Sequence, residues 1–177
     1  LFFSIGLSGF INGSNMTDGA NGLFAISNIF IGISILILSS TLKLNLVNKE
    51  IIFLIIFLIL FLLFNYPLGK IFIGDGGAYY ISFILGIFLI IIFSNYENIN
   101  SWLAITIIIY PMLELFFSII RKLSIGLSPL KADKKHLHLI IFSYLNKSFD
   151  KKVANNLVVL YMLPIISLPL SNILFLN

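Results

Sequence analysis

The stretch IIFLIIFLILFLLF, residues 51–64, holds 14 consecutive apolar side chains and no polar one. A helix needs about 20 apolar residues to cross the hydrocarbon core of a membrane. Taken alone, the run is compatible with a re-entrant or interfacial segment. Extended to Val47 and Leu68, it is long enough to cross, with the amine of Lys49 reaching outward to the headgroups. The run therefore favours a membrane-spanning helix.

The composition of the whole chain supports a membrane protein. The 177 residues are 59% hydrophobic and 10% charged, whereas soluble domains carry about 25% charged residues. Cysteine is absent, which excludes disulfides and thiolate chemistry. We expect an all-α, polytopic transmembrane helical bundle that forms a single membrane domain over residues 1–177. Besides 51–64, the expected spans are Leu23–Leu42, Tyr79–Phe93, Trp102–Ile120 and Val153–Leu176.

The basic residues predict how these spans are oriented. Eight of the eleven Lys and Arg lie between Arg121 and Lys152. By the positive-inside rule, this segment is a cytoplasmic loop, which explains the charge better than nucleic-acid binding does. Lys43 and Lys49 oppose this orientation but are outnumbered. Counting spans in both directions then predicts that three polar segments share the cytoplasmic face: 11–23, 65–78 and 128–139.

Two of these segments are rich in glycine and carry one acid each, Asp18 and Asp75. Glycine lets a ligand approach the backbone closely, and a helix N-terminus attracts phosphate. Mg²⁺ is usually held by one or two carboxylates together with substrate phosphates. The alternative is that each aspartate caps its own helix. For either segment taken alone, the helix cap is the favoured interpretation. Because two such segments lie on the same predicted face as the basic histidine loop, we favour a phosphate site.

The histidines and one membrane acid remain open to several interpretations. His136 and His138, the only histidines, are a weak zinc signal. Their lysine-rich surroundings suit a phosphate-binding loop or contact with anionic membrane lipids, and charge alone favours neither. Acids inside a membrane are functional candidates by default. For Glu114, however, we favour an ion pair with the basic loop over catalysis.

Three further side chains have a functional and a structural interpretation. Asn15, with neighbouring asparagines, offers amide groups to a ligand or lies in a wet loop. Phe72 stacks on a nucleobase or packs in the core. Lys70 neutralises a phosphate or marks the membrane boundary.

Four ordered stretches resemble the polyprenyl-phosphate N-acetylhexosamine-1-phosphate transferases, in the undecaprenyl-phosphate GlcNAc-1-phosphate transferase branch of glycosyltransferase family 4. They are NGSNMTDGANGL (12–23), NYPLGKIFIGDGGA (65–78), PMLELFFSIIRK (111–122) and GLSPLKADKKHLHL (126–139). The resemblance implies transfer of a sugar 1-phosphate from a UDP-N-acetylhexosamine to undecaprenyl phosphate, with release of UMP. It also implies a multi-pass protein of the bacterial cytoplasmic membrane, with its active site on the cytoplasmic face.

The resemblance assigns roles to individual residues. Asp75 would bind Mg²⁺, with Mn²⁺ as the alternative, and Phe72 would stack on uracil. Asp18, His136 and His138 would complete the catalytic site with Asp75, the two histidines holding phosphate. The remaining substrate contacts would come from Asn15, Asn65, Lys70 and Lys134. The oligomeric state stays open between a monomer and a homodimer, and no nucleic acid is expected as a partner.

The chain also departs from the family pattern. Asn21 replaces an aspartate, Leu139 a histidine, Lys134 an arginine and Glu114 an aspartate. The family's upstream Asp-Asp loop lies before the first residue, so we expect the chain to be the C-terminal portion of a longer transferase. The alternatives are a non-catalytic fragment or decayed paralogue that retains the fold, and a transporter with broken helices.

Overall fold

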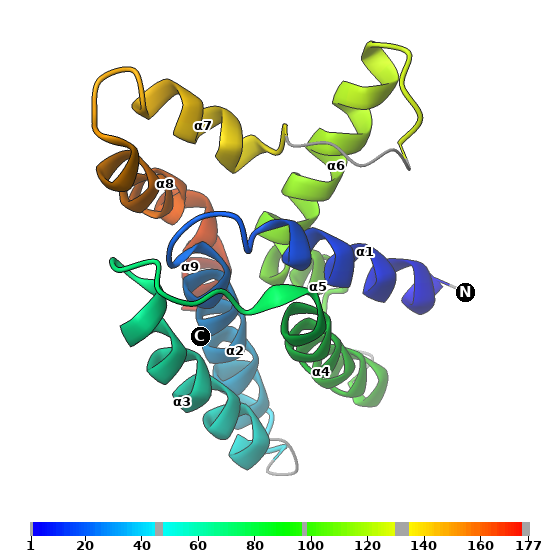
Figure 1. Ribbon diagram of the computed structural model, residues 1–177. Coiled ribbons are helices and arrows are strands. Elements are labelled where there is room, and N and C mark those ends of the chain that lie inside the picture. The colour runs from blue at the N-terminus through cyan, green and yellow to red at the C-terminus, as the bar shows by residue number, and fades with distance from the viewer. Residues whose placement is uncertain (1, 45–47, 97–98, 130–134, 175–177) are drawn as a thin grey trace.

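The computed structural model describes residues 2–44, 48–96, 99–129 and 135–174 of the chain. All regular secondary structure in these residues is helical, which confirms the all-α prediction (Figure 1). The helices are α1 Phe2–Met16, α2 Leu23–Thr41, α3 Asn48–Asn65, α4 Gly74–Asn95, α5 Trp102–Ile107, α6 Ile109–Ser124, α7 Leu137–Leu145, α8 Lys151–Ile166 and α9 Leu168–Leu174.

Within the described residues, four helical stretches are long and apolar enough to cross a membrane. They are α2, α3, α4 and the stretch Lys151–Ser171, which runs through α8 into α9. The helices that contain the short apolar runs 51–64 and 79–93 are longer than the runs at both ends. Helix α3 has 18 residues and α4 has 22. These lengths confirm a polytopic membrane protein, while the single-domain boundary stays a prediction.

The expected span Trp102–Ile120 consists of two helices, because the chain breaks between α5 and α6. Ile108 lies between them with φ −100° and ψ 18°. Pro111 is the cause, since its ring clashes with the carbonyl group four residues earlier and its nitrogen has no proton to donate. That carbonyl belongs to Ile107, the residue at which α5 ends.

The first polar segment also begins inside a helix. The apolar run ends near Ile11, but α1 continues to Met16 and so includes Asn12 and Asn15. Helix α1 packs against α4 and α6. A β-carbon added at Gly13 would lie only 2.1 Å from the carbonyl oxygen of Pro111, so the α1–α6 contact requires glycine.

The remaining packing brings the polar segments to one end of the bundle. Helix α2 lies centrally and contacts α3, α4, α8 and α9, while α7 packs across α8 (Figure 1). A buried pair, Ser14 and Asn28, joins α1 to α2 by a hydrogen bond of 3.1 Å. The turn before α2, the connection before α4 and helix α7 lie toward the end at which α2 begins.

Candidate functional site

The carboxylate of Asp18 joins the two glycine-rich segments. Its Oδ2 accepts a hydrogen bond from the backbone N–H of Gly74 at 2.9 Å, and its Oδ1 accepts one from Ile73 at 3.3 Å. Both N–H groups lie at the start of α4, where a helix has unpaired donors and favours a negative charge. Asp75 is in the first turn of the same helix. The acids of the two segments therefore share one helix N-terminus.

This contact overturns the idea that each aspartate caps its own helix. Gly22 precedes α2 with φ 77° and provides no side-chain cap. Asp18 instead caps α4, a helix that begins far along the chain. Asp75 is the second residue of α4 and is exposed, so it does not occupy the cap position. Its carboxylate is accessible for a ligand.

The electrostatics of the pair suit a cation bound nearby. Burial raises the pKa of Asp18, the N–H groups of Gly74 and Ile73 lower it, and the neighbouring carboxylate of Asp75 adds to the rise. Among the described residues, no group of three or more His, Asp or Glu side chains forms a metal cage. Mg²⁺ does not require one, because substrate phosphates and water complete its coordination around one or two carboxylates. An exposed Asp75 fits that kind of site.

Asn65 fixes the connection between α3 and α4. Its Oδ1 accepts a hydrogen bond from the backbone N–H of Gly22 at 2.6 Å, and its Nδ2 donates to the carbonyl oxygen of Ile71 at 2.6 Å. The side chain is buried. In this structure the amide thus ties the second polar segment to the start of α2. Its role in nucleotide binding stays a prediction.

Helix α8 also reaches the site, through Asn21. The backbone N–H of Asn21 donates to Oδ1 of Asn155 at 2.7 Å, and its Nδ2 donates to Oδ1 of Asn156 at 2.8 Å. The family pattern has an aspartate at this position, and here the asparagine is matched by two further asparagines. Nothing in the sequence singles out Asn155 or Asn156, since both lie within an otherwise mostly apolar span.

The two histidines meet at the start of α7, a helix that the sequence did not predict. His136 precedes the helix in an extended conformation, with φ −75° and ψ 160°, and His138 is the second helical residue. The change from extended to helical backbone brings the rings together, with centroids 5.9 Å apart and planes 10° from parallel. The turn that both rings need to meet one ligand is therefore present.

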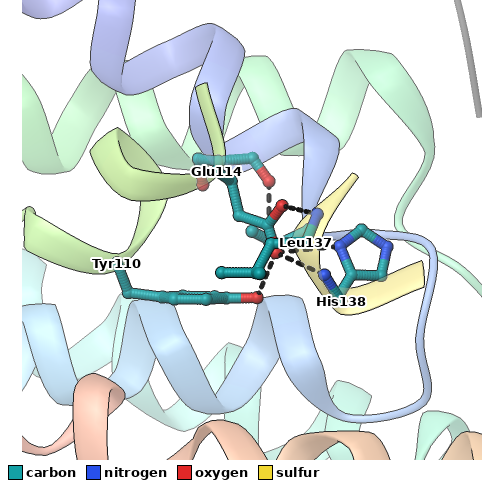
Figure 2. A network of polar contacts seen from close by, with 6 residues as sticks. Tyr110, Glu114, Leu137 and His138 are labelled. Atoms are coloured by element: carbon teal, nitrogen blue, oxygen red, sulfur yellow. Dashed lines mark hydrogen bonds and ion pairs between the residues drawn. The ribbon is translucent and has the colours of Figure 1, made fainter. Parts of the chain in front are cut away.

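Glu114 pairs with His138, as Figure 2 shows. Its Oε1 lies 3.0 Å from Nδ1 of the His138 ring and accepts hydrogen bonds from the Tyr110 hydroxyl at 2.8 Å and the His138 backbone N–H at 3.1 Å. Its Oε2 accepts a hydrogen bond from the Leu137 N–H at 2.9 Å. The partner that we expected for Glu114 in the basic loop is thus His138. The same carboxylate also accepts hydrogen bonds from the N-terminus of α7.

His138 connects this group to the first polar segment. A β-carbon added at Gly19 would lie 2.8 Å from Nε2 of the ring. Gly19 follows Asp18, which caps α4 beside Asp75. Contacts therefore link all three polar segments that the topology placed on one face.

The other predicted site residues lie around this junction. Phe72 and Lys70 are exposed on the connection that leads to Asp75. Asn15 donates through Nδ2 to the hydroxyl of Tyr79 at 3.3 Å. Tyr79 lies one helical turn after Asp75, a spacing that could have singled it out. Lys134 lies outside the described residues, so its placement is not tested.

Comparison with known proteins gives a consistent result. The family model described as "Glycosyl transferase family 4" matches residues 1–93. A protein of Thermotoga maritima named undecaprenyl-phosphate alpha-N-acetylglucosaminyl 1-phosphate transferase is 27% identical over 147 residues. A Yersinia pestis protein of the same name is 30% identical over 136 residues.

The matches cover most of this chain and less than half of each relative. They include 83% of the chain and 44% of the Thermotoga maritima protein, and 74% of the chain and 37% of the Yersinia pestis protein. No solved structure matches the chain.

Proposed function

Because the chain belongs to glycosyl transferase family 4, we propose that it transfers a sugar 1-phosphate from a UDP-sugar to undecaprenyl phosphate and releases UMP. The sugar is an N-acetylhexosamine, with N-acetylglucosamine as the first to test, since the two relatives carry that sugar in their names. The reaction would be the first membrane step in making a cell-envelope polysaccharide, such as lipopolysaccharide or peptidoglycan.

One contact supports this proposal above all, the hydrogen bond from the Gly74 N–H to the Asp18 carboxylate. It gathers two acids at the N-terminus of a membrane helix, beside a segment with two histidines. A nucleotide sugar has a diphosphate of high negative charge, and the helix N-terminus and basic groups offset it. The arrangement suits phosphoryl transfer better than ion transport, whose sites lie near the middle of the membrane.

The chemistry needs one bond exchange at phosphorus. An oxygen of the lipid phosphate attacks the β-phosphorus of the UDP-sugar, and the bond from that phosphorus to the bridging oxygen breaks. The sugar stays on the transferred phosphoryl group, and the bridging oxygen leaves with UMP. When bound at Asp75, Mg²⁺ would neutralise charge on the diphosphate. Positioning and charge stabilisation are the main tasks left to the protein.

The surrounding residues would bind the rest of the substrates. Phe72 offers a ring that is 49% exposed and can stack on uracil. Lys70, on the same connection, can contact a phosphate. His138, whose Nε2 lies next to Gly19, and His136, stacked on its ring, would hold a second phosphate together with Lys134.

The acceptor reaches such a site from the side. Helix α3 exposes a large apolar surface that includes Phe53, Leu60 and Leu63, as expected of a surface in contact with lipid. A polyprenyl chain can stay in the hydrocarbon while its phosphate reaches the end of the bundle. We place this end on the cytoplasmic face of a bacterial cytoplasmic membrane, because the segment Arg121–Lys152 is strongly basic.

UMP release tests the proposal directly. The longest natural form of the protein, in lipid nanodiscs, would be given UDP-N-acetylglucosamine, undecaprenyl phosphate and Mg²⁺, and each component would be omitted in turn. We expect UMP to be released only when the UDP-sugar, the lipid phosphate and a divalent metal ion are all present. Mn²⁺ should be able to replace Mg²⁺. Asp75→Asn should lower the rate by about a hundredfold or more, since a metal site contributes several kcal/mol.

Asp150→Asn is the matched control for Asp75→Asn. Asp150 precedes α8, is exposed and makes no side-chain cap hydrogen bond, so the same chemical change there should leave the rate unchanged. Equal release by the wild type and Asp75→Asn would remove Asp75 from the mechanism. No release by the wild type would favour a non-catalytic member that retains the fold.

A further inference from the structure

The carboxylate of Glu114 is fully buried and is surrounded by hydrogen-bond donors. The four groups directed at it are the Tyr110 hydroxyl, the backbone N–H groups of Leu137 and His138, and Nδ1 of the His138 ring (Figure 2). A buried carboxylate without partners would be costly. The Glu114 carboxylate has partners both in its own helix, α6, and at the start of α7.

These partners decide which nitrogen of His138 carries the proton. The backbone N–H groups can only donate, and an ionised carboxylate can only accept. Nδ1 lies 3.0 Å from Oε1 of Glu114, so the ring satisfies the carboxylate only when Nδ1 is protonated. The tautomer of a histidine is set by the hydrogen bond that its other nitrogen makes. In the neutral ring, Nε2 is therefore left with a free lone pair.

The free nitrogen faces the first polar segment. Nε2 of His138 is buried and has no hydrogen-bond partner in the described part of the chain. It is next to Gly19, where a β-carbon would come within 2.8 Å of it. A buried polar atom without a partner is costly and calls for an explanation. A phosphate oxygen at the Asp18–Gly19 turn would supply the missing partner once Nε2 carries a second proton, because a phosphate oxygen accepts and both nitrogens of the doubly protonated ring donate.

We propose that Glu114 is a positioning residue for phosphate binding, which holds the His138 ring through Nδ1–H so that Nε2, when it also carries a proton, donates to a substrate phosphate at the Asp18–Gly19 turn. This inference rests on the proposed transferase function and adds a residue that touches no substrate itself. Glu114 fixes which ring nitrogen meets a substrate phosphate. Buried partners of this kind commonly hold functional histidines in one orientation.

A purely structural role for Glu114 makes different predictions. The carboxylate also caps α7 through the N–H groups of Leu137 and His138, and loss of a cap lowers the stability of a helix. If capping were its whole role, substitutions would change the unfolding midpoint but not the activity of the folded protein. Nor would a structural role depend on His138 being present.

The tautomer can be measured without any activity assay. Nitrogen NMR of ¹⁵N-histidine-labelled protein in nanodiscs, with His136→Asn to assign the signals, distinguishes protonated from unprotonated ring nitrogens. At a pH where the ring is neutral, we expect His138 to carry its proton on Nδ1. A proton on Nε2 would overturn the inference even if the enzyme is active. An inactive wild type with the proton on Nδ1 would overturn the proposed function and not the ring orientation.

A double-mutant cycle tests the link to catalysis. We expect Glu114→Gln to lower kcat/KM by about ten- to a hundredfold, the usual effect of losing such a partner. In the His138→Gln background, the same change should cause no further loss, because coupled residues do not act additively. Glu114→Asp, which keeps the carboxylate, should recover most of the activity. Additive losses, or an Asp variant as poor as Gln, would overturn the inference.

Discussion

Asp18 and Gly74 are 56 residues apart in the sequence, and the carboxylate of the first accepts a hydrogen bond from the backbone N–H of the second at 2.9 Å. The turn before α2 thereby holds the start of α4. The relationship matters for function because Asp75, the proposed metal ligand, is the next residue along α4. A substitution in the first polar segment should therefore alter the position of Asp75 in the second.

Removing the Asp18 carboxylate should destabilise the protein. Asp18→Ala leaves the N–H groups of Ile73 and Gly74 without their acceptor, and a lost cap costs about 1 kcal/mol. The unfolding midpoint of the purified protein in detergent would report the loss. Asp75→Ala is the control for stability, because Asp75 is exposed and is not the residue that caps α4. Equal midpoints for Asp18→Ala and the wild type would contradict the cap.

A methyl group at Gly19 should impair transfer without unfolding the protein. The new β-carbon of Gly19→Ala would lie 2.8 Å from Nε2 of His138, so the ring must shift. A displacement of about 1 Å at a reacting site can cost about a hundredfold in rate. Gly6→Ala is the control, since nothing lies within 4 Å of its added β-carbon. Wild-type kcat/KM for Gly19→Ala would separate His138 from the site.

The contact between α1 and α6 should be intolerant of any side chain. In Gly13→Ala the β-carbon would lie 2.1 Å from the carbonyl oxygen of Pro111, and backbone cannot move as a flexible side chain does. We expect a loss of about 1–3 kcal/mol in unfolding free energy, the usual cost of overpacking. Gly6→Ala, in the same helix, should be neutral or stabilising because alanine favours helices. Equal stability of the two variants would disprove the close approach.

Asn65 should be sensitive to loss of its donor alone. Asn65→Asp keeps an acceptor for the Gly22 N–H but places a carboxylate oxygen against the carbonyl oxygen of Ile71. Leaving such buried groups unpaired costs about 1–3 kcal/mol. Asn100→Asp is the matched control, because the exposed side chain of Asn100 makes one hydrogen bond to the described residues, in which its Oδ1 accepts from the Trp102 N–H. The two unfolding midpoints should differ, and their agreement would rule out this role for Asn65.

The membrane bundle and the shared face of the polar segments could be predicted because both depend on local composition. Runs of apolar residues such as 51–64 identify spans wherever they occur, and the basic segment predicts their direction, which stays a prediction. The parity of the spans then grouped Asp18, Asp75 and His138, and contacts at Gly74 and Gly19 join these segments.

The partners of individual side chains could not be predicted, because they depend on packing between distant segments. Asp18 lies in a sequence that suits a cap of α2, yet it caps α4. The apolar start of α7 looks like part of a basic loop until Glu114 supplies acceptors for its first N–H groups. The break at Ile108 is the exception, since Pro111 marks it in the sequence.

The fate of labelled phosphorus tests the central claim, transfer of a sugar 1-phosphate, most directly. UDP-N-acetylglucosamine labelled with ³²P at either the α- or the β-phosphate would be incubated with the protein, undecaprenyl phosphate and Mg²⁺, and the lipid would be extracted. We predict that the β-label enters the lipid, that the α-label leaves as UMP, and that Asp75→Asn slows both by about a hundredfold or more. A lipid that gains the sugar without the β-label would contradict this account.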